Sequence, residues 1–162
     1  LARGDSGRNT LNKVKLDLNQ MVSEVWEESQ MIDEKHRYLF RGTDPAYMTG
    51  DIAMIKQSIR IFVQNAAKYS SDGADITLGV MLESGYVSYM IQDEGIGMES
   101  SDVVHIFERF YRSDEARNGE TGGSGLGLSI AKWIVDAHSG TIQVVSRPEI
   151  GTRFIVRFPM CE

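Results

Sequence analysis

One short motif constrains the fold more than any other part of the sequence: an acidic residue and two glycines that follow an apolar stretch. The stretch is residues 87–92, and the motif is Asp93-Glu94-Gly95-Ile96-Gly97-Met98. A β-rich run that ends in this way places a carboxylate at the end of a strand, beside backbone too slim to obstruct a flat ligand. The motif predicts a site for an exocyclic amine, although on its own it also fits a hairpin turn.

A second cluster of glycines precedes a helical pattern. The cluster is Gly122-Gly123-Ser124-Gly125-Leu126-Gly127-Leu128-Ser129, and the apolar helical pattern covers residues 130–135. Glycines at this place let backbone N–H groups approach an anion, and the first helical turn adds unpaired donors and the positive end of the helix dipole. The cluster predicts a phosphate site. Alone it is also typical of a flexible connection, but the two clusters in this order are more specific than either one.

Composition and charge bound the kind of protein. A chain of 162 residues with 41% apolar content is long enough for one main domain with its own core. The net charge of −6, without any run of basic residues, argues against a nucleic-acid partner and favours a small ligand and other proteins. The single Cys161 cannot form an internal disulfide, so we expect a reducing compartment. Because the chain starts at Leu1 without a methionine, we expect a fragment of a longer protein.

The apolar periodicity predicts alternating strands and helices after a short leading segment. Residues 1–12 show little periodicity and are interpreted as a linker or the tail of an upstream helix, whereas residues 13–162 form the domain. Turns are expected at residues 42–47 and 83–85. Strands are expected at residues 14–18, 37–41, 75–82, 86–92, 140–145 and 152–158, with helices at 19–33, 51–70 and 130–135.

A charged segment separates the two glycine clusters. Residues 99–121 combine dense charge with a weak core pattern, which predicts a loop or a partly ordered lid. The centre of this segment, Phe107-Glu108-Arg109-Phe110-Tyr111-Arg112, mixes aromatic and arginine side chains. On its own that mixture is typical of a surface helix whose aromatic residues pack inward. Between two glycine clusters it favours a segment that closes over a ligand.

Three polar side chains share one face of the long helix expected at residues 51–70. Asn65, Lys68 and Tyr69 stand at i, i+3 and i+4 and therefore project from roughly one side. A carboxamide oxygen can ligate a hard cation, an ammonium group can offset phosphate charge, and an aromatic ring can lie against a base. The same residues also fit the end of an ordinary helix, with a solvated lysine and a half-buried tyrosine.

Five segments, taken in order, resemble the N, G1, F, G2 and G3 boxes of sensor histidine kinases. The resemblance covers residues 14–159 and implies the Bergerat ATP-binding fold, an α/β (α+β) two-layer sandwich. In that fold, three helices pack on one face of a mixed sheet of about five strands. The five segments are Asn65-Ala66-Ala67-Lys68-Tyr69-Ser70, Asp93-Glu94-Gly95-Ile96-Gly97-Met98, Phe107-Glu108-Arg109-Phe110-Tyr111-Arg112, Gly123-Ser124-Gly125-Leu126-Gly127-Leu128 and Gly151-Thr152.

Carried over box by box, the resemblance implies the phosphate end of an ATP site. Asn65 would hold Mg²⁺ between the phosphates, and Lys68 and Arg112 would face the phosphate tail. These three residues would serve phosphoryl transfer by positioning and charge neutralisation, which needs no covalent group from this domain. The second glycine cluster would bind the phosphates with Gly123, Gly125, Leu126 and Gly127, and its glycines would hinge the lid.

The resemblance also implies the adenine end of the site. Tyr69 would stack near the base, and Asp93 would accept a hydrogen bond from its amino group. Gly95 and Gly97 would give the base room, and Thr152 would lie beside Asp93 at the floor of the pocket. The cofactors implied are ATP and Mg²⁺.

Two departures from the family pattern limit what the fragment is expected to do. Ile61 stands where many members carry a second asparagine, so Asn65 and water would supply more of the magnesium shell. None of the three histidines has the sequence context of a phosphate acceptor. His36 is expected to be a solvated loop-to-strand residue, His105 a lid residue, and His138 a helix C-terminal residue that faces a favourable dipole. The fragment is therefore expected to bind ATP without phosphorylating itself.

The function implied is that of the catalytic, ATP-binding domain of a two-component sensor histidine kinase. Its partners would be the missing dimerisation and phosphoacceptor domain and a cognate response regulator, within a homodimeric, membrane-bound parent whose catalytic domain is cytoplasmic. One alternative is an anti-sigma-type serine kinase or a conformational ATPase of the same fold, although neither Ile61 nor Gln64 offers a carboxylate to activate water. The other is a nucleotide-sensing pseudokinase module, which Ile61 supports.

Overall fold

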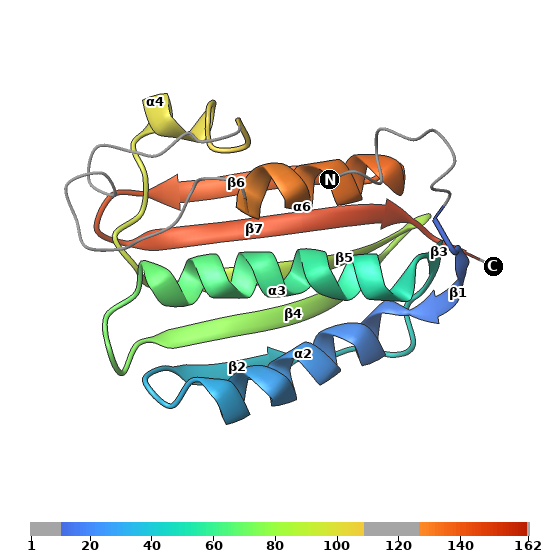
Figure 1. Ribbon diagram of the computed structural model, residues 1–162, viewed down its shortest axis with the longest axis horizontal. Coiled ribbons are helices and arrows are strands. Elements are labelled where there is room, and N and C mark those ends of the chain that lie inside the picture. The colour runs from blue at the N-terminus through green and yellow to red at the C-terminus, as the bar shows by residue number, and fades with distance from the viewer. Residues whose placement is uncertain (1–10, 109–126, 162) are drawn as a thin grey trace.

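The computed structural model describes residues 11–108 and 127–161, and these form two layers (Figure 1). One layer is a five-stranded sheet in the order β2-β4-β5-β7-β6, in which β2 pairs parallel with β4 and every other pair is antiparallel. Three of the described helices cover one face of it. The predicted mixed sheet with three helices on one face is confirmed. The strands are β2 (Arg37–Arg41), β4 (Asp75–Glu83), β5 (Tyr86–Asp93), β6 (Thr141–Arg147) and β7 (Gly151–Pro159), and the helices are α2 (Leu18–Ile32), α3 (Ile52–Lys68) and α6 (Gly127–Ala137).

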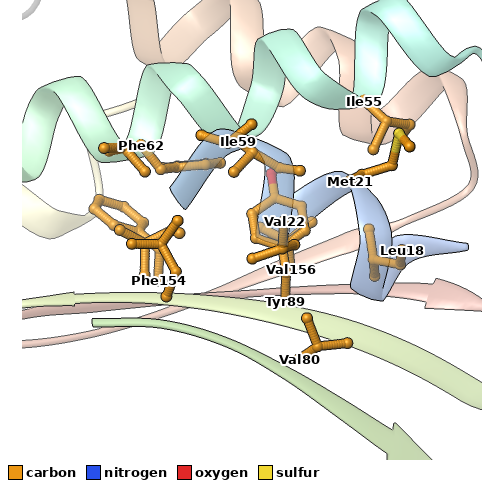
Figure 2. Packing of buried hydrophobic residues seen from close by; sticks show 14 of the residues in the cluster. Leu18, Met21, Val22, Ile55, Ile59, Phe62, Val80, Tyr89, Phe154 and Val156 are labelled. Carbon is orange, nitrogen blue, oxygen red and sulfur yellow. The ribbon is translucent and has the colours of Figure 1, made fainter. Parts of the chain in front are cut away.

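The core lies between the two layers because alternate strand residues point toward the helices. Tyr89 of β5 and Phe154 of β7 are fully buried there and face Phe62 of α3 (Figure 2). The ring of Phe62 lies 4.7 Å from that of Phe154 and 6.2 Å from that of Tyr89, measured between centroids. Burial of each such side chain contributes about 1.5–3 kcal/mol, so these three aromatic residues help to hold α3 against the sheet.

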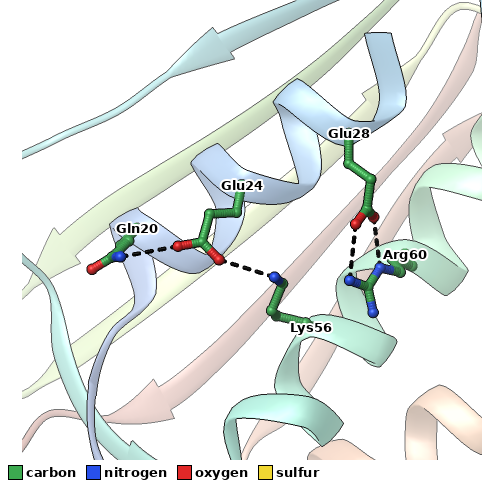
Figure 3. A network of polar contacts seen from close by, with 5 residues as sticks. All are labelled: Gln20, Glu24, Glu28, Lys56 and Arg60. Atoms are coloured by element: carbon green, nitrogen blue, oxygen red, sulfur yellow. Dashed lines mark hydrogen bonds and ion pairs between the residues drawn. The ribbon is translucent and has the colours of Figure 1, made fainter. Parts of the chain in front are cut away.

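Ion pairs connect α2 to α3 at the outer surface (Figure 3). Arg60 donates to both carboxylate oxygens of Glu28 at 2.7 and 3.0 Å, and Lys56 donates to Glu24 at 2.9 Å. These side chains are partly exposed, and such pairs contribute about 0–1 kcal/mol. The spacing of the two helices therefore depends mainly on the apolar core beneath them.

One element was missed by the sequence analysis. Residues 42–47 were expected to be a turn, but Tyr47 begins β3 (Tyr47–Gly50), which pairs antiparallel with β1 (Val14–Asp17) in a separate two-stranded sheet. Met48 of β3 is 1% exposed and joins the core. A strand of four residues carries little periodicity of its own, and its partner lies far earlier in the chain. The remaining predicted elements are present, with bounds that differ by a few residues.

The segment after β5 begins with a short helix, α4 (Ser100–Val103), and a turn. Ile106 is buried, and the ring of Phe107 packs edge-on against Phe154 at 6.4 Å. The start of the expected lid is therefore anchored on the core, and residues 109–121 of it lie outside the described residues. Among the helices that the structure describes, none is both long and apolar enough to cross a membrane.

Candidate functional site

The candidate site residues from different parts of the chain meet at one end of the sandwich. This end contains the C-terminal end of α3, the end of β5, the start of β7 and the start of α6 (Figure 1). Asn65 lies in the last turn of α3, Asp93 is the final residue of β5, and Gly127 is the first of α6. Thr152, near the start of β7, pairs with Asp93 across the sheet. The structure thus brings together residues of four of the five recognised boxes, and of the second glycine cluster only residues 127–129 lie within the described part of the chain.

Asp93 is a buried carboxylate with one oxygen held by the backbone. The residue is 6% exposed, and its Oδ1 accepts from the N–H groups of Gly95 at 2.8 Å and Thr152 at 3.2 Å. Burial raises the pKa of Asp93, and these two hydrogen bonds offset part of that rise. No described residue donates to Oδ2. A carboxylate fixed in this way presents one acceptor to a ligand, which suits an amine donor.

Gly95 allows the loop after β5 to contact the end of α3 directly. A Cβ atom at Gly95 would lie 2.3 Å from the carbonyl oxygen of Tyr69, and that oxygen accepts from the N–H of Ile96 at 3.2 Å. Glycine is therefore required here for close backbone approach. This packing role differs from the room for a base that the resemblance implied, which stays a prediction.

The same loop also contacts the turn between β6 and β7. Gly97 has a φ of 68°, and a Cβ atom there would lie 1.8 Å from the carbonyl oxygen of Arg147. One residue earlier, the carbonyl of Ile96 accepts from the N–H of Glu149 at 2.6 Å. The loop is thus clamped between α3 on one side and the β6–β7 turn on the other.

The predicted phosphate end is only partly within the described residues. Asn65 is half-buried and Lys68 is exposed, with its Nζ 5.8 Å from the centre of the Tyr69 ring. Both residues belong to the last turn of α3. Roles in binding phosphate or metal stay predictions. The other predicted residues of this end, Arg112, Gly123, Gly125 and Leu126, lie outside the described residues.

Ile61 has a structural role of its own. It is partly buried against the core, and its Cγ2 would lie 3.6 Å from a Cβ atom at Gly127. Ile61 and Asn65 are four residues apart on α3 and so lie on one side of the helix. The apolar residue at this departure from the family pattern therefore packs where α6 begins.

Few side chains of the described residues are placed to bind a metal ion. Across the described ranges, no group of three or more His, Cys, Asp or Glu side chains is placed to hold a metal ion. The carboxamide of Asn65 is the donor that the sequence analysis selected, and Mg²⁺ readily keeps several waters and binds through substrate phosphates. So few donors would fit a magnesium ion that arrives with the nucleotide, and Asn65 as its protein ligand stays a prediction.

His36 was expected to be solvated, and this prediction is wrong. Its side chain is 5% exposed, with Nδ1 2.6 Å from Oδ2 of Asp33 and Nε2 3.1 Å from the carbonyl oxygen of Ser70. Tyr38 donates to the same Asp33 oxygen at 2.6 Å. Burial lowers the pKa of His36, but the bonds to Asp33 and Ser70 outweigh it, so the pKa is raised. His36 thus braces the chain immediately after the end of α3.

The other two histidines behave differently from each other. His138 follows α6, as predicted, but it is buried, and burial lowers its pKa more than the bond from Nδ1 to the Ile134 carbonyl raises it. Its Nε2 accepts from the N–H of Asp51 at 3.0 Å, so the neutral ring with a proton on Nδ1 fits the site. His105, in the segment after α4, is exposed and lies 2.6 Å from Glu108.

Ser146 is the site residue that sequence reasoning missed. Its Oγ lies 2.9 Å from the N–H of Met98, 3.1 Å from the carbonyl oxygen of Gly151 and 2.8 Å from Oγ1 of Thr152. The signal in the sequence was the alternation along this strand. Ser146 is a small polar residue at the end of β6, on the same inward face as Ile142 and Val144. No family box contains this position.

A pocket of about 350 Å³ lies beside these residues. Its lining includes Asp93, Ser146 and Thr152, but also Gln92 and Arg153, which alternate toward the uncovered face of the sheet. The pocket therefore extends around the end of the sheet, and it does not include Asn65 or Lys68.

Comparisons with known proteins agree with this geometry. Residues 50–162 match the family model described as histidine kinase-, DNA gyrase B-, and HSP90-like ATPase. Sensor histidine kinase YkoH of Bacillus subtilis is 38% identical over 143 residues, which cover 88% of this chain and 31% of the relative. Sensor-like histidine kinase SenX3 of Mycolicibacterium smegmatis is 32% identical over 146 residues, which cover 89% of this chain and 38% of the relative. The chain thus spans about a third of the length of these relatives.

Solved structures show the same fold. The catalytic domain of histidine kinase ThkA superposes with a TM-score of 0.80 at 24% identity, covering 92% of this chain and 96% of that chain. The mycobacterial sensor histidine kinase MprB gives a TM-score of 0.78 at 24% identity, covering 91% of this chain and 97% of that chain. Neither the serine-kinase nor the pseudokinase alternative is favoured by these matches. The chain belongs to the family of histidine kinase-, DNA gyrase B- and HSP90-like ATPases, and within it to the ATP-binding catalytic domains of sensor histidine kinases.

Proposed function

We propose that this domain binds ATP together with Mg²⁺ at the end of the sandwich where α3, β5, β7 and α6 meet. In the parent protein it donates the γ-phosphoryl group to a histidine on a separate dimerisation domain. The observation that carries the proposal is the Asp93 carboxylate, buried at the end of β5 with Oδ1 held by two backbone N–H groups. A buried carboxylate with a remaining acceptor is a specific partner for the exocyclic amine of adenine.

Each group in the site then has a positioning task. Asp93 accepts from the adenine amine, and Thr152 lies next to it on the neighbouring strand. Lys68 and Arg112 offset the charge of the phosphate tail, and the backbone of the second glycine cluster donates to its oxygens. Asn65 would hold a magnesium ion together with the phosphates and water, and the ion would supply positive charge against the phosphoryl group during transfer. Because phosphoryl transfer depends on in-line positioning, the domain needs no covalent group of its own.

The parent protein is proposed to act as a homodimer at a membrane, with this domain on the cytoplasmic side. Its partners are then its own dimerisation and phosphoacceptor domain and a cognate response regulator. The relatives support the part of this proposal that concerns further domains, since they are named sensor histidine kinases and the chain covers only 31% of YkoH and 38% of SenX3. We do not propose any of the chain's three histidines as the phosphoryl acceptor. Two of them, His36 and His138, are bound by buried hydrogen bonds that a phosphoryl group would break.

Calorimetric titration of the domain with a non-hydrolysable ATP analogue, with and without Mg²⁺, tests the proposal. We expect binding that tightens with magnesium, after which transfer to a histidine-bearing dimerisation hairpin is measured with ATP. Binding that is indifferent to magnesium, with no transfer, would instead favour a nucleotide-sensing module. Absence of any binding would remove the assignment of both glycine clusters.

A further inference from the structure

Three polar side chains form a row across neighbouring strands at the nucleotide end of the sheet. Asp93 of β5 pairs with Thr152 of β7, and Thr152 pairs with Ser146 of β6. Residues directly opposite each other on antiparallel strands point to the same side, with Cβ atoms about 4.5–5.5 Å apart. The row therefore runs along the helix-covered face, from the predicted adenine ligand to a serine outside every family box.

The contacts of Ser146 fix the direction of its hydrogen bonds. A serine hydroxyl has one proton and two lone pairs. The N–H of Met98 can only donate, so at 2.9 Å it uses one lone pair of Ser146 Oγ. The carbonyl of Gly151 can only accept, so at 3.1 Å it accepts the hydrogen bond that the serine hydroxyl donates. One lone pair then remains for the contact with Thr152 Oγ1 at 2.8 Å, so Thr152 is the donor in that bond when the Met98 and Gly151 bonds are both made.

The hydroxyl of Thr152 is left with acceptor capacity only. Its single proton is directed to Ser146, so what it can offer to a ligand is a lone pair. Asp93, the next residue in the row, likewise offers only an acceptor while it is ionised. A base that faces these two groups meets two acceptors side by side. The 6-amino group of adenine can donate to such a pair, whereas the 6-oxo group of guanine would place a third acceptor against it.

We propose that Ser146 is a positioning residue that determines base specificity: by holding the Thr152 hydroxyl as an acceptor, it favours a 6-aminopurine nucleotide over a 6-oxopurine nucleotide. This inference rests on the proposed function, because it concerns the base of the same nucleotide. Ser146 acts through Thr152 and touches no reacting atom. Its bond to the Met98 N–H also ties the loop after β5 to the row.

The test compares the affinities of the domain for non-hydrolysable ATP and GTP analogues, measured by calorimetry in the same buffer. In the wild type we expect the ATP analogue to bind more tightly. Ser146→Ala frees the Thr152 proton to point at the base, so we expect the ratio of the two affinities to fall about tenfold, equal to about 1.4 kcal/mol. A purely structural loss would weaken both analogues equally and leave the ratio unchanged.

A double-mutant cycle shows whether Ser146 acts through Thr152. Thr152→Val removes the hydroxyl with little change in shape, and in that background Ser146→Ala should leave the ratio unchanged. Ser146→Thr keeps a hydroxyl, and a wild-type ratio is expected for it even if Ser146→Ala does not fold. Ser29→Ala, which removes a hydroxyl bonded to the Val25 carbonyl on α2, is the matched control.

The outcomes separate this inference from the proposed function. Wild-type binding of the ATP analogue with a ratio that Ser146→Ala does not change overturns the role of Ser146 alone. If Ser146→Ala lowers the affinity ratio equally in the wild type and in Thr152→Val, the role of Ser146 is also overturned, because the effect would not pass through the Thr152 hydroxyl. Absence of wild-type binding to either analogue overturns both proposals.

Discussion

Among single residues, Asp93 combines a proposed binding task with a cost to the fold. Burial raises the pKa of its carboxyl, so the folded protein holds a proton there more tightly than the unfolded chain does. The sign of the linkage follows: the stability contribution is greatest below the unfolded pKa of about 3.9 and declines as pH rises through the folded pKa. At neutral pH the ionised carboxylate therefore destabilises the empty domain. A buried group retained at such a cost is typical of a functional site.

Asp93→Asn should separate these two effects. The amide oxygen of Asn can still accept from Gly95 and Thr152, which leaves its NH₂ group facing the adenine amine, donor against donor. We expect binding of the ATP analogue to weaken by about 10- to 100-fold, from about 1.5–3 kcal/mol for a hydrogen bond to a charged group. We also expect a higher Tm for the empty variant. Asp136→Asn, at an exposed carboxylate paired with Lys132, should change neither quantity.

Calorimetry and thermal denaturation at pH 7 check both halves of this prediction. Wild-type affinity in Asp93→Asn would contradict the adenine assignment. Unchanged affinity accompanied by a lower Tm would mean that Asp93 serves the fold alone.

The site could be predicted from the sequence only as far as local motifs define it. Asp93 and Thr152 lie in recognisable boxes, and the structure places them side by side. Ser146 could not be found and the burial of His36 could not be predicted, because both depend on partners distant in sequence. Ser146 becomes a site residue through the register of β6 with β7, and the side chain of His36 is buried because it approaches the Ser70 carbonyl 34 residues away.

At the scale of elements, glycines set how closely the loop after β5 packs between α3 and the β6–β7 turn. Gly97 combines a left-handed φ with a Cβ position 1.8 Å from the Arg147 carbonyl oxygen. Gly73 also has a left-handed φ, of 86°, but no atom lies within 4 Å of its Cβ position. A comparison of the two residues therefore distinguishes the cost of a left-handed backbone conformation from the cost of close packing.

Gly97→Ala should destabilise the domain more than Gly73→Ala does. A left-handed alanine costs about 1–2 kcal/mol at either position, and at Gly97 the displaced β6–β7 turn adds about 1–3 kcal/mol of overpacking. Because that turn leads into Thr152, we also expect Gly97→Ala to weaken nucleotide binding about tenfold while Gly73→Ala leaves it unchanged. Urea denaturation and calorimetry measure the two effects. Equal losses of stability in both variants would show that the β6–β7 turn at Arg147 moves away from the new methyl group without a loss of free energy.

Elements with strong periodicity were predictable, and those defined by distant pairing were not. The alternation of β4 and β5 and the apolar face of α3 identified them within a few residues. In contrast, β3 has four residues and exists because it pairs with β1 and packs Met48 into the core. Ile106 was likewise hidden within a charged segment, since a single apolar residue has no period.

At the scale of the whole molecule, two buried histidines brace opposite ends of α3 and respond to pH in opposite directions. His36 bonds to the Ser70 carbonyl just after α3 ends, with Asp33 beside it and Asp72 and Tyr38 nearby. His138 accepts from the N–H of Asp51, the residue that caps the start of the helix. The surroundings of the first histidine favour its charged form, and those of the second favour its neutral form.

The linkage follows from the direction of each pKa shift. The pKa of His36 is raised, so its stabilising contribution is fully present below the unfolded value of about 6.5 and is lost as pH rises through the folded pKa. The pKa of His138 is lowered, so its contribution is fully present above about 6.5 and is lost as pH falls through the folded pKa. The pKa of Asp33 is lowered as well, so Asp33 is already ionised where the histidines titrate.

The domain should therefore be most stable near neutral pH. In a plot of Tm against pH, His36 sets the fall on the alkaline side and His138 the fall on the acid side. His36→Gln removes the group that loses its charge on the alkaline side, and we expect it to flatten the fall of Tm above about pH 6.5. His138→Gln removes the group that resists protonation, and we expect it to flatten the fall of Tm on the acid side. Each variant should leave the other limb unchanged. Thermal denaturation from about pH 5 to 9 measures both slopes, and a variant that lowers Tm equally at every pH would show that its histidine contributes packing without titrating between the folded and unfolded states.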